Sequence, residues 1–269
     1  MTVIEELDAL IEVVKSRMPG NMANPANKKL ESQFKHSLSN YFTTLAEKFP
    51  YHEINAIYNQ NVKEVAPPKI LTAAGEWNDW LDSLLKAFRT QLVASVSGHL
   101  VTIYVQGSTQ MLSYGKTKMG IPILYEGPPM SEAVNWAESY AAGLVKNMDI
   151  ETRSQLAKVI SDGIQNKSGV DGVSRSIRQL FTDMSKTRAD MISQTETNRA
   201  LSQGMFQKMQ DMGVDGKEWI PTEPCEICQG NTDDGVIPID EQFSSGDMMP
   251  PAHPNCRCCL SPVRLDRNK

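Results

Sequence analysis

Hydrophobic residues recur at steps of three and four along most of the first 213 residues, which is the period of amphipathic helices. One apolar stripe covers residues 30–49, and Pro25 before it suits the first turn of a helix. A second stripe covers residues 77–103 and predicts one long helix, or two helices broken near Gly98. Residues 1–119 are therefore expected to form an N-terminal helical region.

Glycine and proline stand at both ends of residues 120–129, GIPILYEGPP, and this composition predicts a linker. Beyond it, Ser131 and Asp149 suit the N-caps of two successive helices. A later helix is expected to begin at Ser185 and to end at Gly213, with several methionines on its apolar stripe. Residues 120–213 are thus expected to form a second region, which is helical after the linker. The methionines on the stripe are more typical of core than of surface.

The stretch QTETNRA interrupts the apolar pattern of that last helix with consecutive polar residues. Glu196 and Arg199 stand three positions apart, so they share a helical face. Spacing alone favours an exposed ion pair worth a few tenths of a kcal/mol. The alternative is a partly buried pair, with Arg188 as a second cation, that fixes this helix against its neighbours or against a partner protein.

The pattern changes after Gly213, where prolines, glycines and short apolar runs replace the helical period. Residues 217–220 and 257–263 suit short strands, and Asp234-Gly235 is a hairpin signal before VIPI. Residues 214–269 are therefore expected to form a separate small module. With so few large hydrophobic side chains, such a module needs a staple or a neighbour to pack against.

All five cysteines of the chain lie in that module, within CEIC and PPAHPNCRCCL. Two thiolates at C-x2-C spacing can occupy two corners of a tetrahedral metal site. The simplest complete site uses four residues and leaves a competitor for the fourth position. These are Cys225, Cys228, His253 and Cys256, with Cys258 as the competing ligand.

Zinc is the metal that this ligand set favours, as one structural ion per chain. Four protein ligands would close the coordination sphere and leave no position for a reacting water, which argues against a catalytic site. Unliganded thiols and redox chemistry are the other uses of such cysteines. Cys259 is expected to be a small buried hydrophobe, because on a strand it faces away from Cys256 and Cys258.

Charge and hydropathy narrow the class of protein. The 269 residues carry a formal net charge of -5, the wrong sign for a protein that mainly wraps nucleic acid. The N-terminus has no basic region of the kind that opens a signal peptide, and no apolar run approaches the ~20 residues that span a membrane. We therefore expect a soluble, non-secreted protein, in which C-x2-C more often binds metal than forms a disulfide.

The order of these motifs resembles the C-terminal domain of the phage Mu F-like head morphogenesis proteins. The resemblance rests on QTETNRA, where that family more often has RTET, then a tryptophan followed by CEIC, DG-V-x-P, Phe243 and PPAHPNCRC. It covers roughly residues 120–265, and the N-terminal 115 residues show no such likeness. The expected fold is mainly α, an extended helical body with a small C-terminal zinc-stapled β-hairpin module.

The resemblance implies a minor head (capsid) protein of a tailed phage, present in few copies inside the head near the portal. It implies a structural role in head morphogenesis and in DNA packaging or ejection. The implied partners are the portal protein, the major capsid or scaffolding protein, and packaged DNA. The implied location is the virion, and the host cytoplasm during assembly.

Two other classes are considered. A nucleic-acid-binding zinc module would use the basic residues near the end of the chain, although nearby acids offset them. These basic residues are Arg257, Arg264, Arg267 and Lys269. An enzyme is not expected, because the chain has no Ser-His-Asp order, phosphate loop or HExxH motif. The chain also ends ten residues after its last cysteine, which we take to exclude the fused C-terminal toxin domain of some relatives.

Overall fold

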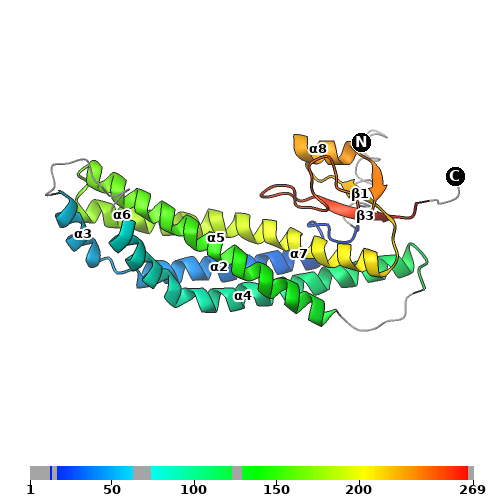
Figure 1. Ribbon diagram of the computed structural model, residues 1–269, viewed down its shortest axis with the longest axis horizontal. Coiled ribbons are helices and arrows are strands. Elements are labelled where there is room, and N and C mark those ends of the chain that lie inside the picture. The colour runs from blue at the N-terminus through cyan, green and yellow to red at the C-terminus, as the bar shows by residue number, and fades with distance from the viewer. Residues whose placement is uncertain (1–12, 14–16, 63–73, 123–128, 266–269) are drawn as a thin grey trace. The chain divides into compact units, whose positions relative to one another are not determined.

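A computed structural model describes residues 13, 17–62, 74–122 and 129–265, except for the side chains of 60–62 and 74–80. Figure 1 shows the order of the elements. The helices are α2 (Pro25–Lys48), α3 (Glu53–Val62), α4 (Ala74–Thr117), α5 (Met130–Gln165), α6 (Gly169–Asp183), α7 (Ala189–Asp211) and α8 (Glu226–Asp233), with a π-helical turn at Met184–Arg188. The strands are β1 (Gly216–Ile220), β2 (Val236–Pro238) and β3 (Cys259–Val263). The mainly α fold with a small C-terminal β module is confirmed.

Of the two alternatives predicted for residues 77–103, one long helix is confirmed, whereas the separate helix predicted to begin at Asp149 is wrong. Helix α4 runs without interruption through Gly98, and α5 runs without interruption through Asp149. A single glycine costs a helix only about 1 kcal/mol, which the buried neighbours Val96 and Leu100 offset. Asp149 is buried, and its carboxylate accepts a hydrogen bond of 2.6 Å from Arg89 instead of capping a helix. The central part of the predicted linker, residues 123–128, lies outside the described residues.

The chain divides into two compact units, each assembled from separated parts of the sequence. Unit 1 comprises residues 1–35, 98–137 and 191–269, and unit 2 comprises residues 36–97 and 138–190. No helix among the described residues is both long enough and apolar enough to cross a membrane.

In unit 1, α4 and α7 approach each other backbone to backbone. A Cβ atom on Gly107 would collide with the carbonyl oxygen of Leu201, and one on Gly204 would collide with that of Tyr104. Only glycine fits these two positions. The contact places α7 firmly on α4, so α7 can serve as a base for the C-terminal module.

Unit 2 encloses a polar network among its apolar residues. Arg89 and Arg153 both pair with Asp82, and Arg89 also pairs with the buried Asp149. Arg188 donates to the carbonyl oxygen of Met148, at 3.1 Å, and to Thr152. Arg188 therefore binds helix α5, and its prediction as a second cation beside Glu196 is not supported by these contacts.

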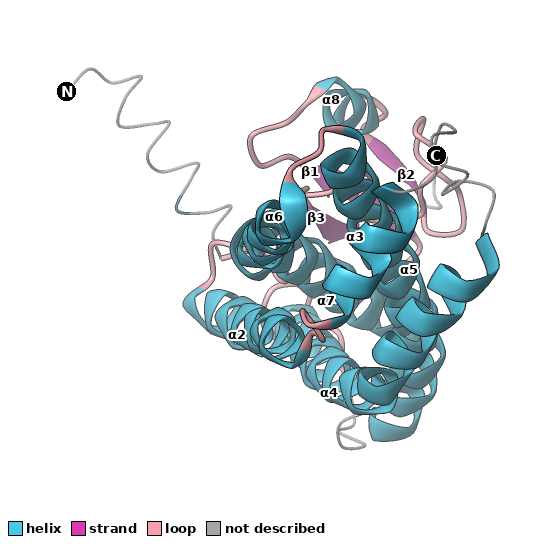
Figure 2. Cartoon of the chain, turned by 90° about the vertical axis from the view of Figure 1, so that its left-hand side faces the viewer, coloured by secondary structure: helices cyan, strands magenta, loops and turns pink. Residues whose placement is uncertain are grey.

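The sheet is antiparallel with the order β2-β1-β3, so β1 is its central strand. Gly216 pairs with Pro238 on one side and with Val263 on the other. Helix α8 lies against β1, and Figure 2 shows the strands beneath it. Asp234-Gly235 ends α8 and does not form a tight hairpin turn, because the eight residues Glu226–Asp233 between β1 and β2 are helical. That local correction leaves the antiparallel pairing of β1 and β2 intact.

The C-terminal module shares its hydrophobic core with the helices of unit 1. Met205 and Met209 on α7 are fully buried against Trp219 of β1, and the ring of Phe243 packs edge-on to Trp219 with centroids 5.1 Å apart. Met111 of α4 belongs to the same cluster. The module therefore has the neighbour that its small size requires, and its position on α7 sets the geometry of the cysteine cluster.

Candidate metal centre

Helix α8 positions the first two cysteines. Cys225 is the N-cap residue, with extended backbone angles, and its carbonyl oxygen accepts the first helical hydrogen bond from Gln229 at 2.8 Å. Cys228 lies in the first turn and is buried, and Thr232 donates its hydroxyl to the Cys228 carbonyl. One turn of helix thus brings both sulfur atoms to the same end of α8.

The loop before β3 positions the remaining candidates. Asn255 adopts a positive φ of 62°, and the amide of Cys256 closes the turn by donating to the carbonyl oxygen of His253. The His253 Nδ1 lies 2.8 Å from the carbonyl oxygen of Pro254, which can only accept. The proton of the ring is therefore assigned to Nδ1, and Nε2 is left with the lone pair that a metal requires.

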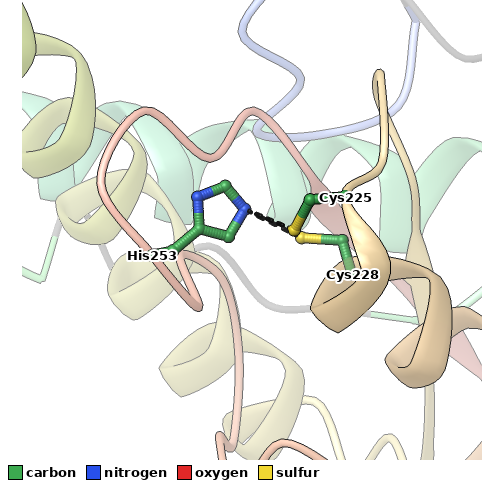
Figure 3. A group of neighbouring side chains, drawn as sticks. All are labelled: Cys225, Cys228 and His253. Atoms are coloured by element: carbon green, nitrogen blue, oxygen red, sulfur yellow. Dashed lines mark hydrogen bonds between the residues drawn. The ribbon is translucent and has the colours of Figure 1, made fainter.

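Nε2 of His253 points at both α8 cysteines, as Figure 3 shows. It lies 3.2 Å from Sγ of Cys225 and 3.2 Å from Sγ of Cys228. On the other side of Cys228, its Sγ lies 3.7 Å from Sγ of Cys256. Two thiolates bound to one zinc ion at 2.3 Å with tetrahedral angles stand about 3.8 Å apart, close to this last distance.

The ligand atoms form two overlapping groups that share Cys228. Cys225, Cys228 and His253 make one group, and Cys228, Cys256 and Cys258 make the other, with the atoms of each group within 4.8 Å of one another. Either group can hold a metal ion with three residues. All five residues predicted from the sequence are therefore brought together, and the fourth position stays open to Cys256 or Cys258.

The pKa values of Cys256 and Cys258 are shifted in opposite directions. The thiol of Cys256 donates a hydrogen bond that lowers the pKa of Cys258 to about 5, and the Thr222 amide and Trp219 indole favour the same thiolate. This hydrogen bond, followed by burial, raises the pKa of Cys256, and burial raises that of Cys228 to about 12. Electrostatics thus favour Cys258 as a thiolate ligand, whereas the 3.7 Å separation favours Cys256.

Polar residues of α7 hold the backbone of the cysteine loop. The side-chain amide of Asn198 donates to the carbonyl oxygens of Cys256, at 2.8 Å, and of Cys258, at 3.1 Å. The amide of Gln194 donates to the carbonyl oxygen of Asn255 at 2.8 Å, and the amide of Asn255 donates to the hydroxyl of Thr195 at 3.0 Å. Helix α7 therefore fixes the loop that carries the second half of the candidate site.

Arg257 joins the same contact from the loop side. Its guanidinium donates to the side-chain oxygen of Gln194 at 2.6 Å and lies 3.7 Å from the carboxylate of Glu31 on α2. These contacts tie the loop to two helices of unit 1. Of the other basic residues considered for nucleic acid, Arg267 and Lys269 lie outside the described residues.

The polar stretch QTETNRA therefore binds the cysteine loop, a role that its spacing did not indicate. The predicted pair exists, with Arg199 3.5 Å from Glu196, but the Glu196 side chain is only 10% exposed. Thr197 and Asn198 are fully buried. Six consecutive polar residues of α7, 193–198, are buried. An uninterrupted polar run inside a predicted helix was the available sign of a fixed partner, since buried polar groups require hydrogen bonds. The spacing did not identify the cysteine loop as that partner.

Cys259 is fully buried at the start of β3 and belongs to neither ligand group. No pair among the five cysteines, all of which are described, forms a disulfide. All five cysteines are therefore free thiols in the structure.

Comparison with known proteins finds a family model that matches part of the chain. Residues 154–261 match the family model described as Phage Mu protein F like protein. The match includes the α7 residues that hold the cysteine loop and every candidate ligand. No curated protein and no solved structure matches the chain significantly. The resemblance predicted from the sequence is confirmed over residues 154–261.

Proposed function

Because residues 154–261 belong to the Phage Mu protein F like family, we propose that the chain is a minor head protein of a tailed phage. Its role is structural, in head morphogenesis and in DNA packaging or ejection. It resides inside the head near the portal, after assembly in the host cytoplasm. The family match carries this proposal, because it includes both the helix α7 and the cysteine cluster that α7 holds.

The cysteine cluster is proposed to bind one zinc ion. Cys225, Cys228 and His253 would supply three ligands, and Cys256 or Cys258 the fourth. The donor set supports zinc, because thiolates with one imidazole are typical of its structural sites. The bound ion would join α8 to the loop before β3.

The proposed site is structural and the protein is proposed not to be an enzyme. A fourth ligand from either Cys256 or Cys258 would complete the tetrahedron and leave no open position for water. The ligand loop is also held rigidly by Asn198, which suits a scaffold. Metal analysis of the purified full chain is expected to find one zinc ion per chain, and protein from zinc-replete medium without zinc would contradict the site.

The rigid module is proposed to dock on the portal protein, and the major capsid or scaffolding protein is the other head partner considered. Two large apolar side chains in the module are exposed. Ile227 on α8 is 49% exposed and Val236 on β2 is 45% exposed. A contiguous exposed apolar patch marks a contact site, and these two side chains are proposed to lie in one.

Co-expression with the portal protein followed by affinity purification tests this proposal. The wild-type chain is expected to co-purify, and the variant Ile227→Asp/Val236→Asp is expected to lose the portal. Ile150→Asp is the matched control, because Ile150 is 52% exposed on α5, in unit 2. Absence of the portal from the wild-type eluate, or equal recovery with the double variant, would contradict the docking surface.

A nucleic-acid-binding module is the alternative function, and it includes contact with packaged DNA. Arg257, one of its predicted basic residues, already binds Gln194 and Glu31, which reduces its availability to phosphate. Retention of the protein on DNA that falls steeply with salt concentration would favour this alternative. Absence of retention at low salt would remove it.

A further inference from the structure

A cavity separate from the metal centre lies in unit 1, between the segment before α2 and the end of α4. It encloses about 510 Å³, and none of its lining residues is a candidate metal ligand. Pockets of 300–1,000 Å³ commonly bind small molecules, and a nucleotide is of that size.

Hydrogen bonds fix the wall of this cavity. Gln110 of α4 accepts a hydrogen bond from the amide of Gly20 at 2.8 Å and donates one to the side chain of Asn27 at 2.8 Å. Asn27 is fully buried and donates to the carbonyl oxygen of Asn21 at 2.9 Å. The segment before α2 is thereby held against α4, so the cavity has a defined shape before any ligand enters.

The lining of the cavity is cationic and rich in hydrogen-bond donors. Arg17 and Lys118 both line it, and none of the nine described lining residues carries a carboxylate. Ser113 and Tyr114, whose side chains carry hydroxyls, also line it. This is a local excess of positive charge on a chain whose formal net charge is -5.

Asn24 adds one more donor. Asn24 lines the cavity, and its side-chain oxygen accepts a hydrogen bond from the amide of Ala26 at 2.9 Å, so its side-chain N–H groups are not used in that bond. Among the described lining residues, two cations with neutral polar neighbours and no carboxylate are the complement of a phosphate group. Tyr114 is the aromatic residue among the described lining residues, and bases stack on aromatic rings.

We propose that this cavity binds a phosphate-bearing ligand of nucleotide size, with Arg17 and Lys118 holding the phosphate. The phosphate can belong to a free nucleotide or to one nucleotide unit of a nucleic acid strand. This inference does not depend on the proposed head function or on zinc.

Two probes distinguish the sources: fluorescent ADP, and a fluorescein-labelled single-stranded oligothymidylate. Binding of either to the full chain is measured by fluorescence anisotropy. In Arg17→Gln/Lys118→Gln, the affinity for the bound probe is expected to fall by about tenfold or more, because charge-assisted hydrogen bonds to phosphate are lost. Lys116→Gln is the matched control. It removes one positive charge, where the double variant removes two, at a position two residues from Lys118 that is not among the described lining residues.

Binding of ADP that the double variant loses and the control keeps supports a nucleotide site. Binding of the oligothymidylate alone, with the same response to the variants, supports a strand-binding site. Circular dichroism is measured on each variant, and an unchanged spectrum and melting temperature show that the fold is retained. The proposal is overturned if neither probe binds, if the double variant binds as well as wild type, or if Lys116→Gln weakens binding equally.

Discussion

Replacement of Asn198 by alanine is expected to release the cysteine loop from α7. Asn198 is fully buried, and its amide donates to the carbonyl oxygens of Cys256 and Cys258, which are themselves buried. Each hydrogen bond contributes about 1 kcal/mol, and each carbonyl left unpaired adds a desolvation cost of similar size. The change should therefore destabilise the C-terminal module by about 2 to 4 kcal/mol.

Hydrogen exchange measured by mass spectrometry provides the local readout. In Asn198→Ala, the amides of residues 255–260 are expected to exchange much faster, and chelator competition is expected to show metal affinity about 10- to 100-fold weaker, as for other residues that orient ligands. Gln207→Ala is the control, since Gln207 lies on the same helix and makes only an exposed hydrogen bond, to Asp211. If Asn198→Ala exchanges like the control, the loop is not held by α7.

Three further predictions concern the same unit. Cys225→Ser should abolish zinc binding and loosen α8 and residues 248–258, whereas β1 stays packed on α7 through Trp219; zinc retained at one ion per chain would contradict this. Burial lowers the pKa of Lys217 from 10.5 to about 8, so the unfolded chain binds more protons in that window and the stability of the module should rise from about pH 8 to 10.5. Urea titrations should show this rise in wild type and a smaller one in Lys217→Met; equal slopes would exclude Lys217 as its source. Glu196→Ala should lower the unfolding free energy by more than the ~0.5 kcal/mol of an exposed pair, because the carboxylate is largely buried; an unchanged urea midpoint would contradict this.

The sequence predicted which parts of the chain are helices, the limits of α2 and the C-terminal end of α7, but not that α5 is continuous through Asp149. The stripe of residues 30–49 became α2, because its buried positions follow one helical face. A break near Gly98 was one of two alternatives, and Asp149 was read as an N-cap, both from local propensity alone. Packing overrides that propensity when the flanking residues are buried on both sides, and no sequence window contains the partner helices that cause it.

The candidate metal ligands were predictable because C-x2-C and the histidine loop are local patterns with a chemical meaning. The α7 residues that hold the ligand loop could not be predicted from the sequence. Asn198 lies about sixty residues from the cysteines that it binds, and nothing in its immediate sequence identifies a distant backbone carbonyl as its partner. The module was expected to be separate because its local sequence does not show the residues that complete its core. These include Met111 and Met205, which come from helices remote in the sequence.

Quantitative mass spectrometry of mature heads, purified from the phage that encodes this chain, tests the proposed head function most directly. The account predicts that peptides of this chain are present in few copies per head, and that cryo-EM of the same particles shows its helical density inside the shell beside the portal. Heads that package DNA normally and contain no copies of the chain would contradict it.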